Sequence, residues 1–251
     1  ERYPDARAMI DRLHARDVRV MLWTVCAINT DSPNFAEADS NRYLLTSGPG
    51  QATLIVKWWK GPGGLVDFFN PSAVEWWHRL LDKVLDQGID GWKADGTDYA
   101  VVGGDFYSPG AGRNVQRLEY SHAYYRDLYE YSRAKLGKDR IITARPVDNY
   151  GFGLGGEWVS FAPIDINFAG WVGDQDATFG GMRAALDNIY QSAQMGYLAA
   201  GSDIGGYRRD DEAPSAWGRT KEVFIRWTQL GALSPVMENG GGGEHRPWMY
   251  D

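Results

Sequence analysis

The sequence contains one cysteine, Cys26, in 251 residues, so it cannot form an internal disulfide. This argues weakly against a disulfide-stapled secreted domain and leaves the cellular compartment undetermined. Long hydrophobic runs are missing too, since no apolar stretch approaches the roughly 18 residues of a membrane span. The first ten residues, ERYPDARAMI, have neither the basic nor the apolar region of a signal peptide. We therefore expect no membrane partner.

A basic excess is also lacking. Asp and Glu outnumber Lys and Arg by 33 to 26, which gives a formal net charge of -7. No run of Lys and Arg forms a stripe that could follow a polyanion, so nucleic acid is not an expected partner. Neither composition nor charge indicates an oligomeric state.

Several kinds of catalytic site have no motif in this sequence. The four histidines, at positions 14, 78, 122 and 245, show no paired ligand spacing, so we expect no zinc or other metal site. No G-x-S-x-G segment indicates a Ser-His-Asp nucleophile. The glycine-rich segments at Gly61 and Gly240 do not follow a first strand, as a phosphate-binding turn would.

Aromatic residues are abundant, with 11 Trp, 14 Tyr and 9 Phe. Most of these rings are expected in the core. A sugar ring, however, presents flat C–H faces that bind well to rigid apolar plates with a polar edge, so carbohydrate is a plausible class of ligand.

Short apolar runs alternate with longer amphipathic segments along the whole chain, which is typical of repeated strand–helix units around a parallel sheet. The expected strands are 18–24, 89–94, 140–144, 168–172, 197–200 with its turn GSDIGG, and 232–236. The expected helices are 4–15, 71–87, 119–135, 178–195 and 213–230.

About six such units predict a (β/α)8 TIM barrel, an α/β fold seen here as about strands 3 to 8 and truncated on its N-terminal side. We expect residues 1–251 to form one incomplete catalytic barrel domain, because no linker or low-complexity segment interrupts them. A doubly wound parallel sheet is the alternative.

Four polar residues end or directly follow expected strands: Asp95, Arg145, Asp174 and Asp203. In barrel enzymes the active site lies at the carboxyl ends of the strands, so these side chains are expected to converge. Each Asp could instead cap the next helix. Converging carboxylates beside aromatic plates favour glycoside hydrolysis, in which one carboxyl attacks the anomeric carbon and the other protonates the leaving oxygen.

Four motifs, in this order, resemble glycoside hydrolase family 31. GIDGWKADGTD (88–98) resembles the family's nucleophile motif and GWVGD (170–174) its acid/base motif, while GSDIGGY (201–207) and RWTQLGALSP (226–235) resemble two further signatures. The resemblance covers essentially the whole chain, starting after the family's second strand. It implies a retaining, exo-acting α-glycosidase of the α-glucosidase or α-xylosidase type that needs no cofactor.

Carried over position by position, the resemblance implies that Asp95 is the nucleophile and Asp174 the general acid/base. The implied substrate-binding residues are Trp59, Trp92, Lys93, Arg145, Asp203, Tyr207 and His245. A lysine two residues before the nucleophile resembles the α-xylosidase-like bacterial branch. Two departures bear on specificity: Asp98 stands where many members have Glu, and the loop before His245 is longer than usual.

A retaining mechanism predicts that the two catalytic carboxyl groups lie about 5 to 5.5 Å apart. Other readings stay open: α-galactosidase or sulfoquinovosidase specificity, an α-transglycosylase or lyase on the same scaffold, and a carbohydrate-binding barrel without turnover.

Overall fold

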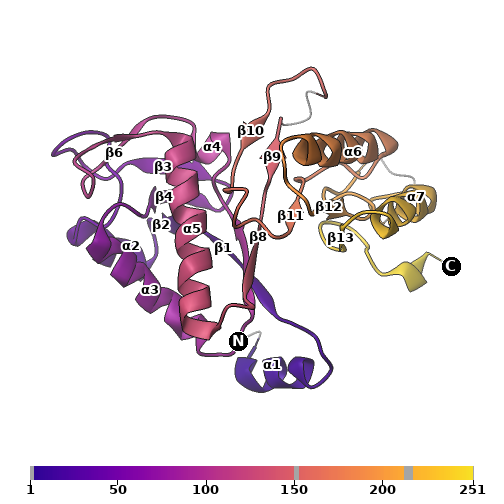
Figure 1. Cartoon of the computed structure of the whole chain (residues 1–251), viewed down its shortest axis with the longest axis horizontal. Helices are drawn as coiled ribbons and strands as arrows, with labels where there is room; N and C mark the ends of the chain where they lie inside the picture. Colours follow the sequence, from indigo (N-terminus) through magenta and orange to yellow (C-terminus); the bar gives the residue numbers. More distant parts are fainter. Residues whose placement is uncertain (1–2, 150–152, 212–216, 251) are drawn as a thin grey trace. The chain divides into compact units, whose positions relative to one another are not determined.

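The computed structural model describes residues 3–149, 153–211 and 217–250. The chain divides into two compact units, Glu1–Ile142 and Thr143–Asp251, and each is described by itself (Figure 1).

The first unit contains a parallel sheet and its helices (Figure 1). The sheet has the order β1 (Met21–Val25), β5 (Gly91–Asp95) and β8 (Ile141–Ala144), and β8 runs across the boundary between the units. Strands β1 and β5 pair from Met21 with Gly91 to Val25 with Asp95. A Cβ at Gly91 would come within 2.2 Å of the carbonyl oxygen of Ile141, so only glycine fits this close approach.

Helix α3 (Pro71–Leu85) shows why the expected helices form. Asn70 caps it by accepting a hydrogen bond from the Ser72 N–H at 3.0 Å, and Pro71 occupies the first turn, where its missing N–H costs nothing. Its buried face packs beside α5 (Arg117–Leu136), and Phe68 contacts rings of both helices, Trp77 at 6.0 Å and Tyr124 at 5.4 Å. The remaining helices of this unit are α1 (Ala6–His14), α2 (Pro33–Ser40) and α4 (Tyr99–Val102).

Two antiparallel elements of the first unit are additional to the expected strands. Strands β2 (Ala27–Asn29), β4 (Gly61–Leu65) and β3 (Ile55–Trp58) form a sheet in that order, and β6 (Phe106–Ser108) pairs with β7 (Arg113–Val115). Strand β4 was not predicted, because its glycines leave no alternating pattern of apolar and polar side chains. At Gly63 a Cβ would come within 2.8 Å of the Ile28 carbonyl oxygen, so the strand needs glycine where a strand pattern has a side chain.

The second unit has its own parallel sheet, in the order β11 (Gly170–Trp171), β12 (Ala200–Asp203) and β13 (Val236–Glu238). Helices α6 (Phe179–Gln194) and α7 (Lys221–Ala232) pack against β12, and the core between them includes Val172, Ile204, Phe224 and Trp227. The short strands β9 (Val147–Asp148) and β10 (Val159–Ser160) form a hairpin, and a 3-10 turn, η1, covers Pro247–Met249.

The predicted α/β pattern with parallel strands is confirmed, with two shifts. The segment 201–203, expected as a turn, is strand, and the last strand starts only at Val236 because α7 runs on to Ala232. Residues 213–216 of the expected helix 213–230 lie outside the described residues, and the prediction is wrong for 217–220, because α7 begins only at Lys221. In the described part of the chain, the strands form separate sheets and no closed barrel. The single domain and the N-terminal truncation stay predictions.

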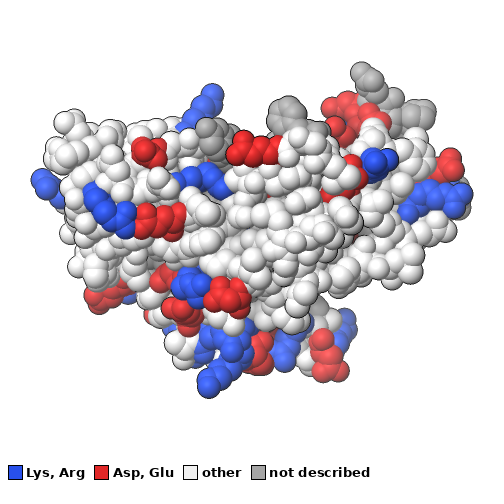
Figure 2. Space-filling model, turned by 45° about the horizontal axis from the view of Figure 1, so that its top comes forward, with Lys and Arg blue, Asp and Glu red and all other residues white. Residues whose placement is uncertain are grey.

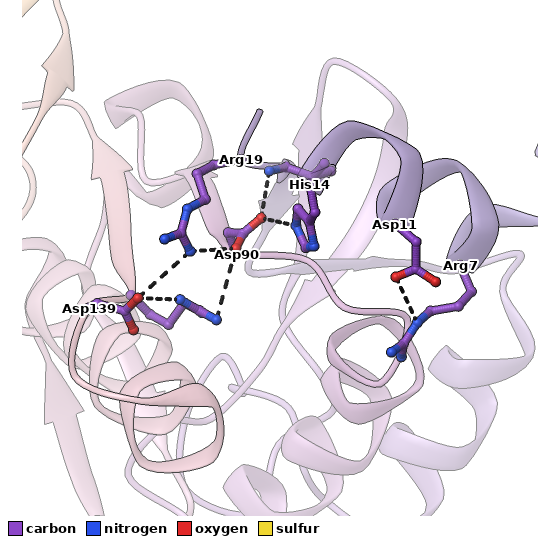
Figure 3. Close-up of polar contacts among 8 residues, drawn as sticks. Arg7, Asp11, His14, Arg19, Asp90 and Asp139 are labelled. Atoms are coloured by element: carbon purple, nitrogen blue, oxygen red, sulfur yellow. Dashed lines mark hydrogen bonds and ion pairs between the residues drawn. The ribbon is translucent and has the colours of Figure 1, made fainter. Parts of the chain in front are cut away.

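A buried carboxylate joins α1, β1 and β5 at the amino end of β5 (Figure 3). Asp90 is 6% exposed; its Oδ2 accepts a hydrogen bond from the Val20 N–H at 2.7 Å and lies 2.7 Å from His14 Nε2, while its Oδ1 accepts from Arg19 at 3.0 Å. Arg19 also approaches the exposed Asp139 at 3.7 Å.

The face shown in Figure 2 carries Lys and Arg interspersed with Asp and Glu. Among the residues that the structure describes, no helix is both long and apolar enough to cross a bilayer.

Candidate active site

Asp95 ends β5 and is nearly enclosed, with 7% of its surface exposed. Side chains alternate along a strand, so Asp95 shares one face of β5 with Lys93. Trp23, the register partner of Lys93 on β1, reaches diagonally to Asp95, and its indole Nε1 donates a hydrogen bond to Asp95 Oδ2 at 3.1 Å. The chain then turns at Gly96, whose φ of +95° suits glycine and whose Cβ would come within 2.9 Å of the Val25 side chain.

Three tryptophans form a cluster beside this carboxylate. The rings of Trp23 and Trp58 stack with centroids 6.4 Å apart and an interplanar angle of 18°, and Trp59 meets Trp58 edge-on at 5.3 Å. The indole N–H of Trp58 donates to Asn29 Oδ1 at 2.8 Å, which fixes its ring. Trp59 is 49% and Trp23 44% exposed, so both rings offer open apolar surface in the cluster that contacts Asp95 through Trp23.

A layer of buried hydroxyl groups supports the turn after Asp95. The Thr97 hydroxyl lies 3.0 Å from the Tyr125 hydroxyl and accepts from Ser121 Oγ at 2.8 Å, while Tyr124 donates to the Thr24 carbonyl at 3.2 Å. Burial, followed by the nearby Asp95 carboxylate, raises the pKa of Tyr125 well above its usual value. Tyr125 therefore stays neutral.

Cys26 is inert in this structure. It is buried, and burial raises the pKa of its thiol to about 12. The thiol donates to the Gly96 carbonyl at 3.4 Å, which places it in the support of the turn. A protonated, enclosed thiol is not a nucleophile.

Trp92 and Lys93 lie on opposite faces of β5. Trp92 is 3% exposed, and its indole N–H donates to Ser132 Oγ on α5 at 3.0 Å. This is the geometry of a packing residue between strand and helix, and a sugar contact by Trp92 stays a prediction that its burial does not favour. Lys93 is half-buried on the face of Asp95.

Arg145 and Asp174 are paired in the second unit. Arg145 follows β8 and is 6% exposed; its Nη2 donates to Asp174 Oδ1 at 3.2 Å. On its other side Nη1 lies 3.9 Å from Asp148 Oδ2, and the guanidinium lies over the Trp171 ring at 5.2 Å from the centroid. These two residues, which follow β8 and β11, are therefore in direct contact, and the Asp174 side chain keeps 36% exposure.

The loop that carries Asp174 is held by amide side chains. Gln175 and Asn188 both donate to the Val172 carbonyl, at 2.6 and 3.0 Å, and Asn188 also donates to Asp148 Oδ1 at 3.2 Å. Gly173 has a φ of +102°, and a Cβ there would come within 3.0 Å of the Arg145 guanidinium. These contacts fix the backbone of the loop, which in turn sets the direction of the Asp174 side chain.

Asp203 ends β12 with 4% exposure, in register with Glu238 of β13. Tyr207 follows it and is 41% exposed. Asp174 and Asp203 therefore both lie at the carboxyl ends of neighbouring parallel strands, as predicted for a barrel rim.

Arg219 organises the glycine-rich loop before His245 and was not predicted from the sequence. It is fully buried and donates to the carbonyls of Gly205, Gly206 and Gly242 at 2.9, 3.1 and 2.6 Å, and also to that of Glu244. A guanidinium has no acceptor, so the 2.9 Å contact with His245 Nε2 makes that nitrogen the acceptor. Burial and then the Arg219 charge lower the pKa of His245, which keeps the ring neutral.

The predicted site residues thus fall into two groups. Asp95, Trp59, Trp92 and Lys93 belong to the first unit, while Asp174, Arg145, Asp203, Tyr207 and His245 belong to the second. The carboxyl separation of about 5 to 5.5 Å stays a prediction. No group of three or more His, Cys, Asp or Glu among the described residues is arranged to hold a metal ion.

Comparison with known proteins agrees with the motifs. The sequence model for the glycosyl hydrolases family 31 TIM-barrel domain matches residues 1–251. The chain is 28% identical over 264 residues to the alpha-xylosidase XylQ of Lactiplantibacillus pentosus and 29% identical over 252 residues to a sulfoquinovosidase of Agrobacterium fabrum. These alignments cover 100% and 98% of the chain but 31% and 35% of the relatives, so the chain spans about a third of their length.

Among solved structures, the chain is similar to the cycloalternan-forming enzyme of Listeria monocytogenes in complex with a pentasaccharide substrate, with a TM-score of 0.78 and 22% identity. That match covers 98% of this chain and 23% of the enzyme. At this identity the likeness concerns the fold.

Proposed function

The chain belongs to glycoside hydrolase family 31, and from this premise we propose that it carries the catalytic carboxylates of a retaining, exo-acting α-glycosidase of the α-glucosidase or α-xylosidase type. In this proposal Asp95 is the nucleophile and Asp174 the general acid/base. The observation that carries it is that two carboxylates in family motifs lie at or just beyond the carboxyl ends of parallel strands, Asp95 as the last residue of β5 and Asp174 three residues after β11.

The reaction has two displacements. Ionised Asp95 attacks the anomeric carbon, the bond from that carbon to the leaving oxygen breaks, and protonated Asp174 gives its proton to this oxygen. Asp174, now a carboxylate, then takes a proton from water, which attacks the anomeric carbon and releases Asp95. Two inversions at one carbon retain its configuration.

The other residues would bind the sugar. Arg145 donates to Asp174, and we expect its remaining guanidinium donors to bind sugar hydroxyls beside this carboxyl group. Trp59 would supply an apolar plate and Lys93 a cationic donor on the face of Asp95. Asp203, Tyr207 and His245, all of the second unit, would also bind the sugar.

Two kinds of sugar are the main candidates for the substrate. Lys93 favours an α-xyloside, and the alpha-xylosidase relative supports this choice. A sulfonated sugar is the second candidate, because another relative is a sulfoquinovosidase. Hydrolysis of aryl α-xyloside, α-glucoside, α-galactoside and sulfoquinovoside by the full-length protein would decide.

Substitution of each carboxylate tests the assigned roles. Asp95→Ala should abolish turnover of every substrate, however activated its leaving group. Asp174→Ala should still form the glycosyl intermediate from a substrate whose leaving group needs no proton, and this intermediate should accumulate because no base activates water. Azide should rescue Asp174→Ala and release a glycosyl azide of retained configuration, while with Asp95→Ala it could react only by inversion.

Asp176→Ala is the matched control, because Asp176 lies two residues from Asp174 in the same loop and is 66% exposed. It should keep normal kcat/KM. Azide products of the opposite configurations would show that the roles are reversed. Near-normal activity of both Asp95→Ala and Asp174→Ala would show that other residues do the chemistry.

A further inference from the structure

The hydrogen bond from Trp23 to Asp95 occupies one defined carboxylate oxygen. The indole Nε1 lies 3.1 Å from Oδ2 of Asp95, and the two residues come from neighbouring parallel strands, β1 and β5, paired in register up to Asp95 itself. An indole N–H can only donate, so this contact keeps Oδ2 as an acceptor.

The position of the Trp23 ring is itself fixed by a second tryptophan. It stacks on Trp58 at 6.4 Å, and Asn29 Oδ1 accepts from the Trp58 indole at 2.8 Å. Asn29 is tied in turn to the next loop, since its amide donates to the Lys60 carbonyl at 3.1 Å. A chain of fixed planar groups therefore ends at the Asp95 carboxylate, and the carboxylate has little freedom to rotate about its last torsion.

We propose that Trp23 is a positioning residue that holds Oδ2 of Asp95 and so presents Oδ1 to the anomeric carbon. The inference rests on the proposed nucleophilic role of Asp95. In the first displacement Oδ1 forms the bond to the anomeric carbon, the leaving oxygen takes the electron pair of the broken bond together with the proton of Asp174, and Oδ2 keeps its hydrogen bond to Trp23. Reaction rate depends steeply on such alignment.

Because 44% of Trp23 is exposed, its ring could instead serve only as a plate for the sugar. The two roles differ in the part of the side chain that they need. A plate needs the two fused rings, whereas positioning needs the N–H. Replacement of Trp23 by β-(3-benzothienyl)alanine keeps the fused rings and exchanges the N–H for sulfur, so it tests the hydrogen bond alone.

The experiment measures kcat and KM of the full-length protein on an aryl α-glycoside with a poor leaving group, for which the first displacement limits the rate. We expect kcat of the benzothienyl variant at position 23 to fall roughly 10- to 100-fold, the range that a misplaced reacting group produces, with KM nearly unchanged. Trp77 is the matched control. It is a buried tryptophan of α3 whose indole nitrogen has no hydrogen-bond partner in the described part of the chain, so the same replacement there should leave both constants unchanged.

Asn29→Ala supplies a second variant that leaves Trp23 intact. It removes the acceptor that fixes Trp58, and kcat should fall by a smaller factor with KM again unchanged. A wild-type kcat in the benzothienyl variant would overturn the inference, and so would a rise in KM alone, which would identify Trp23 as a sugar plate. If the unaltered protein and Asp95→Ala hydrolyse the substrate equally, the proposed function itself fails, and the inference with it.

Discussion

Replacement of Asp90 by Asn should loosen the junction of α1, β1 and β5 (Figure 3). Asn keeps the size of the side chain and one acceptor oxygen, but it loses the charge and turns an NH2 group toward donors. The Val20 N–H at 2.7 Å and His14 at 2.7 Å are the important partners, because hydrogen bonds to a buried charge contribute about 1.5–3 kcal/mol each. Arg19 is 65% exposed and adds at most about 1 kcal/mol.

The bonds with Val20 and His14 end on the same oxygen, Oδ2, so both can re-form to the Asn oxygen, but bonds to a neutral acceptor contribute only about 0.5–1.5 kcal/mol each. We therefore expect a loss of about 2 kcal/mol in local stability. This corresponds to roughly a 30-fold fall in the protection of amide hydrogens, since about 1.4 kcal/mol changes an equilibrium constant tenfold. Hydrogen exchange measured by mass spectrometry on peptides covering residues 14–25 of the full-length protein would detect it.

Asp139→Asn is the matched control. Asp139 contacts Arg19 and Arg140 in the same cluster but is 61% exposed, so its replacement should change stability by less than about 1 kcal/mol. Equal exchange in the two variants would refute the view that burial makes the Asp90 contacts strong.

The same contacts predict a pH dependence. Burial by itself would raise the pKa of Asp90, but the Val20 N–H, His14 and Arg19 outweigh it and leave the pKa lowered. A carboxyl whose pKa is lower in the folded state stabilises the fold above its unfolded pKa of about 3.9 and loses this effect as the pH falls through the folded value. The difference between wild type and Asp90→Asn should therefore shrink as the pH falls below about 4. A difference that does not shrink on acidification below about pH 4 would refute the argument.

Three further predictions concern other parts of the fold. Gly201→Ala should greatly reduce soluble yield and lower Tm, because the new Cβ would lie 1.8 Å from a backbone oxygen of β13, whereas Gly104→Ala, with nothing within 4 Å, should be neutral. Cys26 should resist iodoacetamide at pH 8 in the native protein and react after denaturation, as peptide mass spectrometry can show, because burial raises the pKa of its thiol to about 12. Arg219→Met should lower Tm by leaving four carbonyl groups without their donor, and Arg208→Met, at a 63% exposed side chain, should not.

The sequence by itself was sufficient for the parallel strands, the main helices and the family. Helix α3 shows why: its cap, its proline and its apolar spacing all lie between Asn70 and Leu85, so local preferences and hydrophobic periodicity agree. The family motifs are local in the same way, and they identified Asp95 and Asp174 as candidates without any contact being known. The glycine strand β4 was missed because close backbone approach, not side-chain alternation, determines it.

The partners of these residues were decided only by the tertiary structure. Trp23 is 72 residues from Asp95 along the chain and Asn188 is 40 from Asp148, and no spacing rule connects them. Trp92 and Lys93 are neighbours in the sequence, but the pleat of β5 sends one toward α5 and keeps the other on the face of Asp95. Arg219 belongs to no motif, and its role in holding the loop depends on the four carbonyl groups that surround it in the folded chain. Local patterns specify which element forms, whereas the hydrogen bonds that orient a site depend on which elements pack together.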